Sequence, residues 1–104
     1  PDAAFFNGFA VHCLEWDAVH EPAVVHALSV VTAALLAQAD RAPVQADAFL
    51  TALAVGVEIA SVLGLAATGP MRFFRPATAG VVGAALATAR LRGLAPDRFA
   101  GLLG

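Results

Sequence analysis

The sequence predicts an all-α fold of about five helices, and three observations lead to this prediction. Apolar residues recur at spacings of three and four along most of the 104 residues, which is the period of an amphipathic helix. Proline, glycine and aspartate gather at a few points and divide the chain into segments of helical length. No segment alternates apolar and polar residues as a half-buried strand does. We therefore expect part of a larger helical domain.

The first two helices are expected on either side of a proline. The first runs from Ala3 to about Asp17, because its apolar residues share one side of a helix. These residues are Phe6, Ala10 and Cys13, with Phe5, Phe9 and Trp16 beside them. The segment His20-Glu21-Pro22 ends this helix, since the residue before a proline is pushed away from helical angles. The second helix is expected from about Pro22 or Ala23 to Ala39, and residues 40–43 close it.

The third helix is expected from about Asp47 to Ala66, with Asp47 as its N-cap. Its core face is predicted to consist of apolar residues that share one side of the helix, with Glu58 as a buried helix-pairing residue. The predicted core residues are Leu50, Leu53, Ala54, Val57 and Leu63. A turn at residues 68–70 and an irregular link at residues 71–76 follow.

The fourth helix is expected from about Ala77 to Leu91 and carries a stripe of small residues that permits close approach of another helix. The stripe is Gly80, Gly83, Ala84 and Ala87. Gly93 is predicted to end this helix, and Pro96 with Asp97 to open a fifth.

The composition indicates a chain whose surface is covered by something else. Apolar residues make up 60% of it, charged residues 13%, and the mean hydropathy is +0.78. Soluble helical domains keep a polar face, so we expect cover from another part of a longer protein, a second copy or lipid. The chain begins without methionine and ends in an apolar segment, which favours a piece of a longer protein.

The sequence disfavours a membrane span and a nucleic-acid partner, and it favours a reducing compartment. The apolar runs at 22–39 and 48–71 are too short or are interrupted by Glu58, and basic loops do not flank them, so we expect no membrane span. A small membrane helix bundle stays open as an alternative. A net charge of −2, with six arginines and no lysine, predicts no nucleic-acid partner. The single cysteine fits a reducing compartment, and we expect a cytoplasmic protein.

Polar chemistry is concentrated between residues 12 and 26. This stretch holds all three histidines, the only cysteine, and the acids Glu15 and Asp17. Two helices joined by a short turn can bring both ends of such a stretch, His12 and His26, into one cleft. Histidine and carboxylate groups facing each other across a cleft are what proton abstraction requires.

Other interpretations of this cluster stay open. A hydrogen-bond network that caps the helix ends would use the same side chains. The spacing matches no familiar zinc pattern, so we expect no metal. A nucleophilic Cys13 has the least support, because it lies in an apolar helix without an activating basic group.

The order of residues adds a family resemblance. The run Ala4-Phe5-Phe6-Asn7-Gly8-Phe9-Ala10-Val11-His12, followed by Leu14-Glu15-Trp16-Asp17 and His26, closely resembles the N-terminal helical domain of the MmgE/PrpD family. That family includes 2-methylcitrate dehydratases, cis-aconitate decarboxylases and related epimerases. Segments 50–60 and 74–80, then Gly93-Leu94, are similar to further family motifs in the same order. The resemblance covers nearly the whole chain.

This resemblance implies a lyase or isomerase that works without a cofactor. It implies that residues 1–104 are part of a helical domain, followed by a smaller α/β domain in a homodimer. It also implies a small di- or tricarboxylate substrate that loses a proton next to a carboxylate. Such chemistry needs a base, an acid and cations that hold the substrate carboxylates.

The resemblance also assigns candidate site residues. His26 matches a family histidine and is expected to carry the proton, with Glu15 or Asp17, which match two family acids, as its partner. The carboxylate anchors are expected to be Arg75, which stands where the family has histidine, or Arg72. The supporting residues are expected to be Asn7 and His12.

Several positions depart from the family pattern. Ala18 replaces a third acid, Glu15 replaces aspartate, and Ala27 and Leu28 follow His26 in place of proline and serine. Arg75 is a permanent cation and cannot act as a base at neutral pH. Two alternatives follow: an enzyme with different carboxylate chemistry, or a catalytically inactive helical module that associates with itself.

Overall fold

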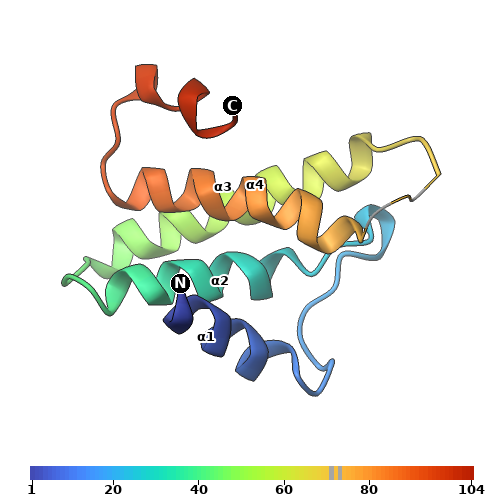
Figure 1. Ribbon diagram of the computed structural model, residues 1–104, viewed down its shortest axis with the longest axis horizontal. Coiled ribbons are helices and arrows are strands. Elements are labelled where there is room, and N and C mark those ends of the chain that lie inside the picture. The colour runs from blue at the N-terminus through green and yellow to red at the C-terminus, as the bar shows by residue number, and fades with distance from the viewer. Residues whose placement is uncertain (71, 73) are drawn as a thin grey trace.

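The computed structural model describes residues 1–70, 72 and 74–104, and it is built from helices (Figure 1). The α-helices are α1 (Asp2–His12), α2 (Ala27–Ala39), α3 (Ala46–Ala66) and α4 (Arg75–Leu91). Short 3₁₀ turns are η1 (Glu21–Ala23), η2 (Pro96–Arg98) and η3 (Ala100–Leu102). Within the described ranges no strand forms, and the all-α prediction is confirmed. Met71 and Phe73, in the expected irregular link, lie outside the described residues.

Helix α2 lies at the centre of the arrangement. It packs against α1, α3 and α4, while α3 and α4 form the most extensive pair (Figure 1). Helix α1 packs mainly on α2, and η1 packs on α3. The buried core follows this arrangement, with Leu35, Val25 and Val31 as its largest fully buried side chains. The segment between α1 and α2 is thereby held by α1, which packs on α2, and by η1, which packs on α3.

The α3–α4 interface, which we call the seam, brings two backbones into contact. A Cβ atom added to Gly83 would lie 2.4 Å from the carbonyl oxygen of Gly56. A Cβ atom added to Gly56 would lie 2.7 Å from the Cβ of Ala87. Of the small-residue stripe predicted for α4, Gly83 and Ala87 are buried in the seam and Gly80 is buried against Val30 of α2. Ala84 is only half-buried, so the stripe is confirmed in part.

The predicted core face of α3 is wrong. The buried residues of α3 are the small ones, Ala52, Gly56, Ala60 and Gly64. Of the predicted core residues, Leu53 and Val57 are half-buried, and Leu50, Ala54 and Leu63 are exposed, as is Glu58. The reason is geometric: two helices in backbone contact accommodate only the smallest side chains between them, so the larger ones turn outward.

Two helix boundaries also differ from the prediction. Helix α1 ends at His12 rather than near Asp17, because Glu15 adopts a left-handed conformation with φ of 53°. Helix α2 begins at Ala27 rather than near Pro22, because Val24, with φ of 55°, separates η1 from it. A non-glycine residue at such angles cannot continue a right-handed helix.

The remaining boundaries lie close to those expected. Helix α3 begins one residue early and Asp47 makes no capping bond, since Gln45 occupies the N-cap position. Helix α4 begins at Arg75, with Pro76 in its first turn. Gly93, with φ of 65°, ends α4 as predicted. The expected fifth helix after Pro96 forms the turns η2 and η3.

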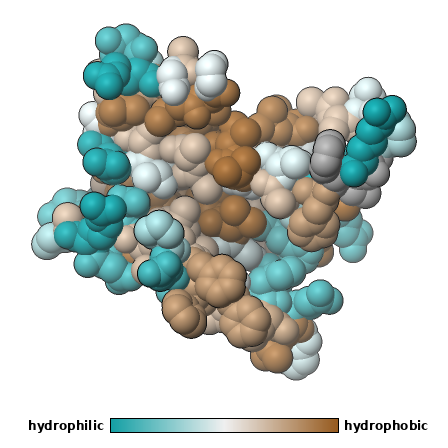
Figure 2. All heavy atoms as spheres, viewed as in Figure 1, coloured by the Kyte–Doolittle hydropathy of each residue, from teal (hydrophilic) through white to brown (hydrophobic). Residues whose placement is uncertain are grey.

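Large apolar side chains remain on the surface. Figure 2 shows a continuous apolar area over α1, where Phe5, Phe6 and Phe9 are about two-thirds exposed. Among the described residues, α3 is long and apolar enough to cross a membrane. The core helix of a soluble protein passes the same test, so the expectation of no membrane span stays a prediction.

Candidate functional site

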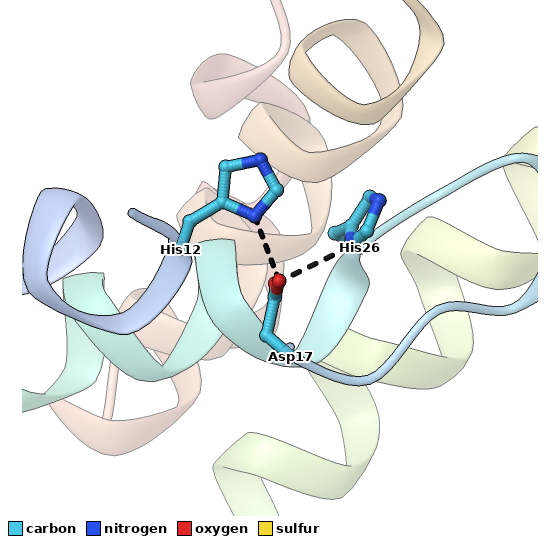
Figure 3. Close-up of side chains that lie close together, drawn as sticks. All are labelled: His12, Asp17 and His26. Carbon is cyan, nitrogen blue, oxygen red and sulfur yellow. Dashed lines mark hydrogen bonds and ion pairs between the residues drawn. The ribbon is translucent and has the colours of Figure 1, made fainter. Parts of the chain in front are cut away.

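The segment between α1 and α2 brings three polar side chains together (Figure 3). His12 is the last residue of α1, Asp17 lies in the connecting loop, and His26 is the N-cap residue of α2. The Nδ1 atom of His12 lies 2.8 Å from Asp17 Oδ1, and the Nδ1 atom of His26 lies 3.2 Å from Asp17 Oδ2. The hydroxyl of Ser29, in the first turn of α2, donates a hydrogen bond to Oδ2. We call these four residues the Asp17 cluster.

The loop that carries Asp17 is anchored at its far end. The backbone N–H of His20 donates to the carbonyl of Val25 at 2.9 Å, and His20 Nδ1 accepts a hydrogen bond from the Ala23 N–H at 3.2 Å. Ala23 and Val25 are fully buried, and a Cβ on Gly64 of α3 would lie 2.6 Å from the Ala23 carbonyl oxygen. Because this part of the loop packs on α3, it holds His26 in place at the start of α2.

Asp17 is the negative centre of the cluster. Its side chain is only 5% exposed. Burial by itself raises the pKa of Asp17, but hydrogen bonds from Ser29 and His12 outweigh it and lower the pKa to about 2. Asp17 is therefore ionised at neutral pH and accepts hydrogen bonds through both oxygens.

The two histidines are held differently by Asp17. His12 makes a short hydrogen bond, whereas His26 Nδ1 lies near the carboxylate without hydrogen-bond geometry and is buried without another partner among the described residues. The two rings pack edge to face, with their centroids 4.8 Å apart. In Figure 3 the second nitrogen of each ring points away from Asp17 and toward the same side.

A small cavity lies against this pair of rings. Its volume is about 210 Å³, and its wall is mostly apolar. It is lined by Gly8, His12, His26, Ser29, Val30 and Pro76. Residues from α1, α2 and α4 thus line a space that both histidines border.

The structure brings together some of the candidate residues and separates others. His12, Asp17 and His26 meet in the Asp17 cluster. Glu15 is exposed and lies outside the cluster. It adopts a left-handed conformation in the turn after α1, two residues before Asp17. Arg72 is exposed in the link before α4.

Two other candidates lie next to the cavity wall. Arg75 is half-buried at the first turn of α4, adjacent in sequence to the cavity residue Pro76. Asn7 is half-buried and adjacent to the cavity residue Gly8. Ser29 is the residue that sequence reasoning missed, although it lies three residues after His26 and so shares a helix face with it.

His12, Asp17 and His26 also have the donor types that bind zinc, and one ligand atom of each lies within 4.8 Å of the others. The His12–Asp17 separation of 2.8 Å is that of a hydrogen bond. Two ligands of one tetrahedral zinc ion would lie roughly 3.3 Å apart. The geometry is therefore that of a hydrogen-bonded cluster, and the expectation of no metal stays a prediction.

The comparisons with known proteins give one match. The family model of the MmgE/PrpD N-terminal domain matches residues 1–104, which is the whole chain. No curated protein and no solved structure matches.

Proposed function

The chain belongs to the MmgE/PrpD family, and from this premise we propose that it forms part of a cytoplasmic, homodimeric lyase or isomerase. The enzyme removes a proton next to a carboxylate in a small di- or tricarboxylate and uses no cofactor. The observation that carries this proposal is a buried, ionised Asp17 in contact with two imidazoles that line one cavity.

His26 is the base. Attraction between its Nδ1 and the Asp17 carboxylate favours the tautomer with the proton on Nδ1, which leaves the Nε2 lone pair free to accept a proton. Asp17 is a positioning residue, because a carboxylate with a pKa of about 2 keeps its charge at neutral pH and does not exchange protons there. This division of roles keeps the imidazole of His26 oriented while it gains and loses a proton.

Arg75 is the best-placed anchor for a substrate carboxylate. Its guanidinium is always charged and presents donors that match a carboxylate. Arg75 is half-buried beside the cavity residue Pro76, whereas Arg72 is exposed. Asn7 supports the opposite wall from α1, next to Gly8. Glu15 lies outside the Asp17 cluster and has no role in the proton transfer.

The test uses hydrogen exchange in the full-length protein. Small polycarboxylates are incubated with enzyme in deuterated water, and incorporation of deuterium next to the carboxylate is followed by NMR. We expect His26→Asn to lower the exchange rate by about 10² or more, the usual contribution of a general base. Asparagine is a good N-cap residue, so this change preserves the start of α2.

A matched control distinguishes the effect of losing His26 from the effect of losing any histidine in this segment. His20 lies outside the Asp17 cluster, and His20→Asn should leave exchange at the wild-type rate. Equal losses in the two variants, or wild-type exchange in His26→Asn, would contradict the role of His26.

The exposed aromatic face of α1 supports the second candidate function, a helical module that associates with itself. Phe5, Phe6 and Phe9 form an apolar surface of the kind found at protein interfaces. This candidate predicts that the full-length protein catalyses no exchange with any carboxylate tested and that His26→Asn leaves self-association, measured by sedimentation, intact.

A further inference from the structure

The side chains of His12, Asp17 and His26 are arranged as a set of metal ligands. Two imidazoles and one carboxylate bind zinc in sites where water takes the fourth position. The Nδ1 atoms of His12 and His26 lie 2.8 Å and 3.2 Å from the two oxygens of Asp17, and one ligand atom of each residue lies within 4.8 Å of the others. In Figure 3 both Nδ1 atoms face the carboxylate, so the three ligand groups converge on one place.

One of these ligand atoms lacks a hydrogen-bond partner. His26 Nδ1 is buried and makes no hydrogen bond to any described residue. A buried polar atom without a partner costs free energy, and a metal ion that accepts the nitrogen lone pair removes this cost. The Asp17 side chain is only 5% exposed, so it gives up little further hydration when it binds an ion.

The hydrogen bond between His12 and Asp17 belongs to the metal-free state. Nδ1 and Oδ1 are 2.8 Å apart with a proton between them, and an ion in place of the proton needs about 0.5 Å more. The His12 side chain is 40% exposed, so a small rotation of the ring provides this separation while α1 stays in place. The short distance is therefore compatible with a site that zinc fills by displacing a proton.

Space and a supporting hydrogen bond are also present. A cavity of about 210 Å³ borders both histidines, and a water molecule takes up roughly 30 Å³, so water can complete the coordination. The hydroxyl of Ser29 donates to Oδ2 of Asp17. Hydrogen bonds of this kind orient a carboxylate that binds a metal.

The spacing of these ligands in the sequence matches no zinc motif because the loop, and not one helix, brings them together. Familiar motifs place ligands at short, regular intervals. Here Glu15 and Val24, both with positive φ, interrupt the helical path on either side of Asp17. The folded segment then places Asp17 between the end of α1 and the start of α2.

We propose that His12, Asp17 and His26 bind a zinc ion, with water as the fourth ligand. This inference goes beyond the proposed function and does not depend on it. The ion takes the Nδ1 of His26 and the charge of Asp17, which orient the base in the proposed reaction, so zinc inhibits that reaction and is not its cofactor. The ion also ties α1, in which none of the described residues is buried, to the start of α2.

The test measures zinc binding by the full-length protein without substrate. Protein treated with a chelator is titrated with zinc chloride in a calorimeter. We expect the affinity to fall about 10²-fold or more in His12→Asn and Asp17→Asn, because loss of a ligand costs at least as much as loss of a supporting hydrogen bond. Ser29→Ala keeps all three ligands and should lose about tenfold.

Two controls separate this site from other groups in the same segment. His20 and the exposed Cys13 bind metals in principle but lie outside the proposed ligand set. His20→Asn and Cys13→Ser should bind zinc with the wild-type affinity. Equal losses in His20→Asn and His12→Asn would overturn the inference.

Exchange of backbone amide hydrogens locates the ion within the protein. Zinc should slow exchange in residues 2–12 of the wild-type protein, because the ion ties α1 to α2, and should have no such effect in His12→Asn. No zinc binding by the wild-type protein, or wild-type affinity in both His12→Asn and Asp17→Asn, would overturn the inference. Zinc binding by a protein that exchanges no substrate hydrogen would leave this inference standing and contradict only the proposed function.

Discussion

The α3–α4 seam and the Asp17 cluster are held together by opposite means. In the seam, glycines on both helices bring backbone against backbone, and a single added Cβ atom would meet a carbonyl oxygen at 2.4 Å. In the cluster, the side chains of His12, His26 and Ser29, from two helix ends, converge on the carboxylate of Asp17 in the loop. The seam depends on close backbone contact, whereas the cluster depends on hydrogen bonds and on the charge of one buried carboxylate.

This difference locates stability and chemistry in different parts of the molecule. The two regions are joined through η1, because Ala23 packs on Gly64 of α3 and leads directly toward His26. A rigid helix pair thus supports a loop that would otherwise have few buried contacts. Changes in the seam should therefore reduce stability most, and changes in the cluster should alter pH dependence and catalysis.

The largest expected effect on stability comes from Gly83→Ala. The added methyl group collides with the Gly56 backbone, so the helices must separate, and we expect a loss of about 2–3 kcal/mol in the free energy of unfolding. Alanine would otherwise favour a helix by about 1 kcal/mol. Urea unfolding of the full-length protein measures the difference.

Gly69→Ala is the matched control for the seam. A Cβ on Gly69 has no neighbour within 4 Å among the described residues, so the same substitution should change the free energy of unfolding by less than about 0.5 kcal/mol. If Gly83→Ala were as well tolerated as Gly69→Ala, the close approach of α3 and α4 would be contradicted.

An intermediate effect on the free energy of unfolding is expected for Asp17→Asn. This change removes the charge at the centre of the cluster and leaves the seam intact. The folded-state pKa of about 2 lies below the ordinary value of about 3.9 in an unfolded chain. The depressed pKa therefore stabilises the fold above about pH 4, and this contribution is lost as the pH falls toward 2.

The measurement compares unfolding free energies of the two proteins from pH 7 to pH 2. At pH 7 we expect Asp17→Asn to be less stable by about 1 kcal/mol, because the hydrogen bonds from Ser29 and His12 lose their charged acceptor. The difference should shrink on acidification. Asp40→Asn changes an exposed acid and should show little difference at any pH. A difference in unfolding free energy between the wild-type protein and Asp17→Asn that stays constant with pH would contradict the ionised, hydrogen-bonded state of Asp17.

The sequence was sufficient for the order of the four α-helices, and it was insufficient for some of their boundaries and for the way they face one another. Breakers such as Pro43 and Gly93 mark where helices end, because their backbone chemistry is local. The buried face of α3 is not local. The apolar pattern of the sequence placed Leu50 and Leu63 in the core, whereas close contact with α4 requires Gly56 and Ala60 there.

The candidate site shows the same limit. His12, Asp17 and His26 were predicted, since their chemistry and the family resemblance mark them, and the structure brings them together. The left-handed conformation of Glu15 was not predictable, because nothing in a glutamate residue marks positive φ. That single backbone angle separates Glu15 from the cluster.

The smallest expected effect on stability concerns η1, which connects the seam to the Asp17 cluster. His20 Nδ1 accepts a hydrogen bond from the Ala23 N–H and so caps η1, which rests on α3. Loss of this cap in His20→Ala should cost about 0.5–1 kcal/mol in unfolding free energy, whereas His20→Asn keeps a side-chain acceptor and should cost a few tenths at most. If the loop serves to position His26, His20→Ala should also slow deuterium exchange by a few-fold while His20→Asn does not. Equal behaviour of the two variants would mean that the buried contacts of Ala23 and Val25, rather than the cap, hold the loop on α3.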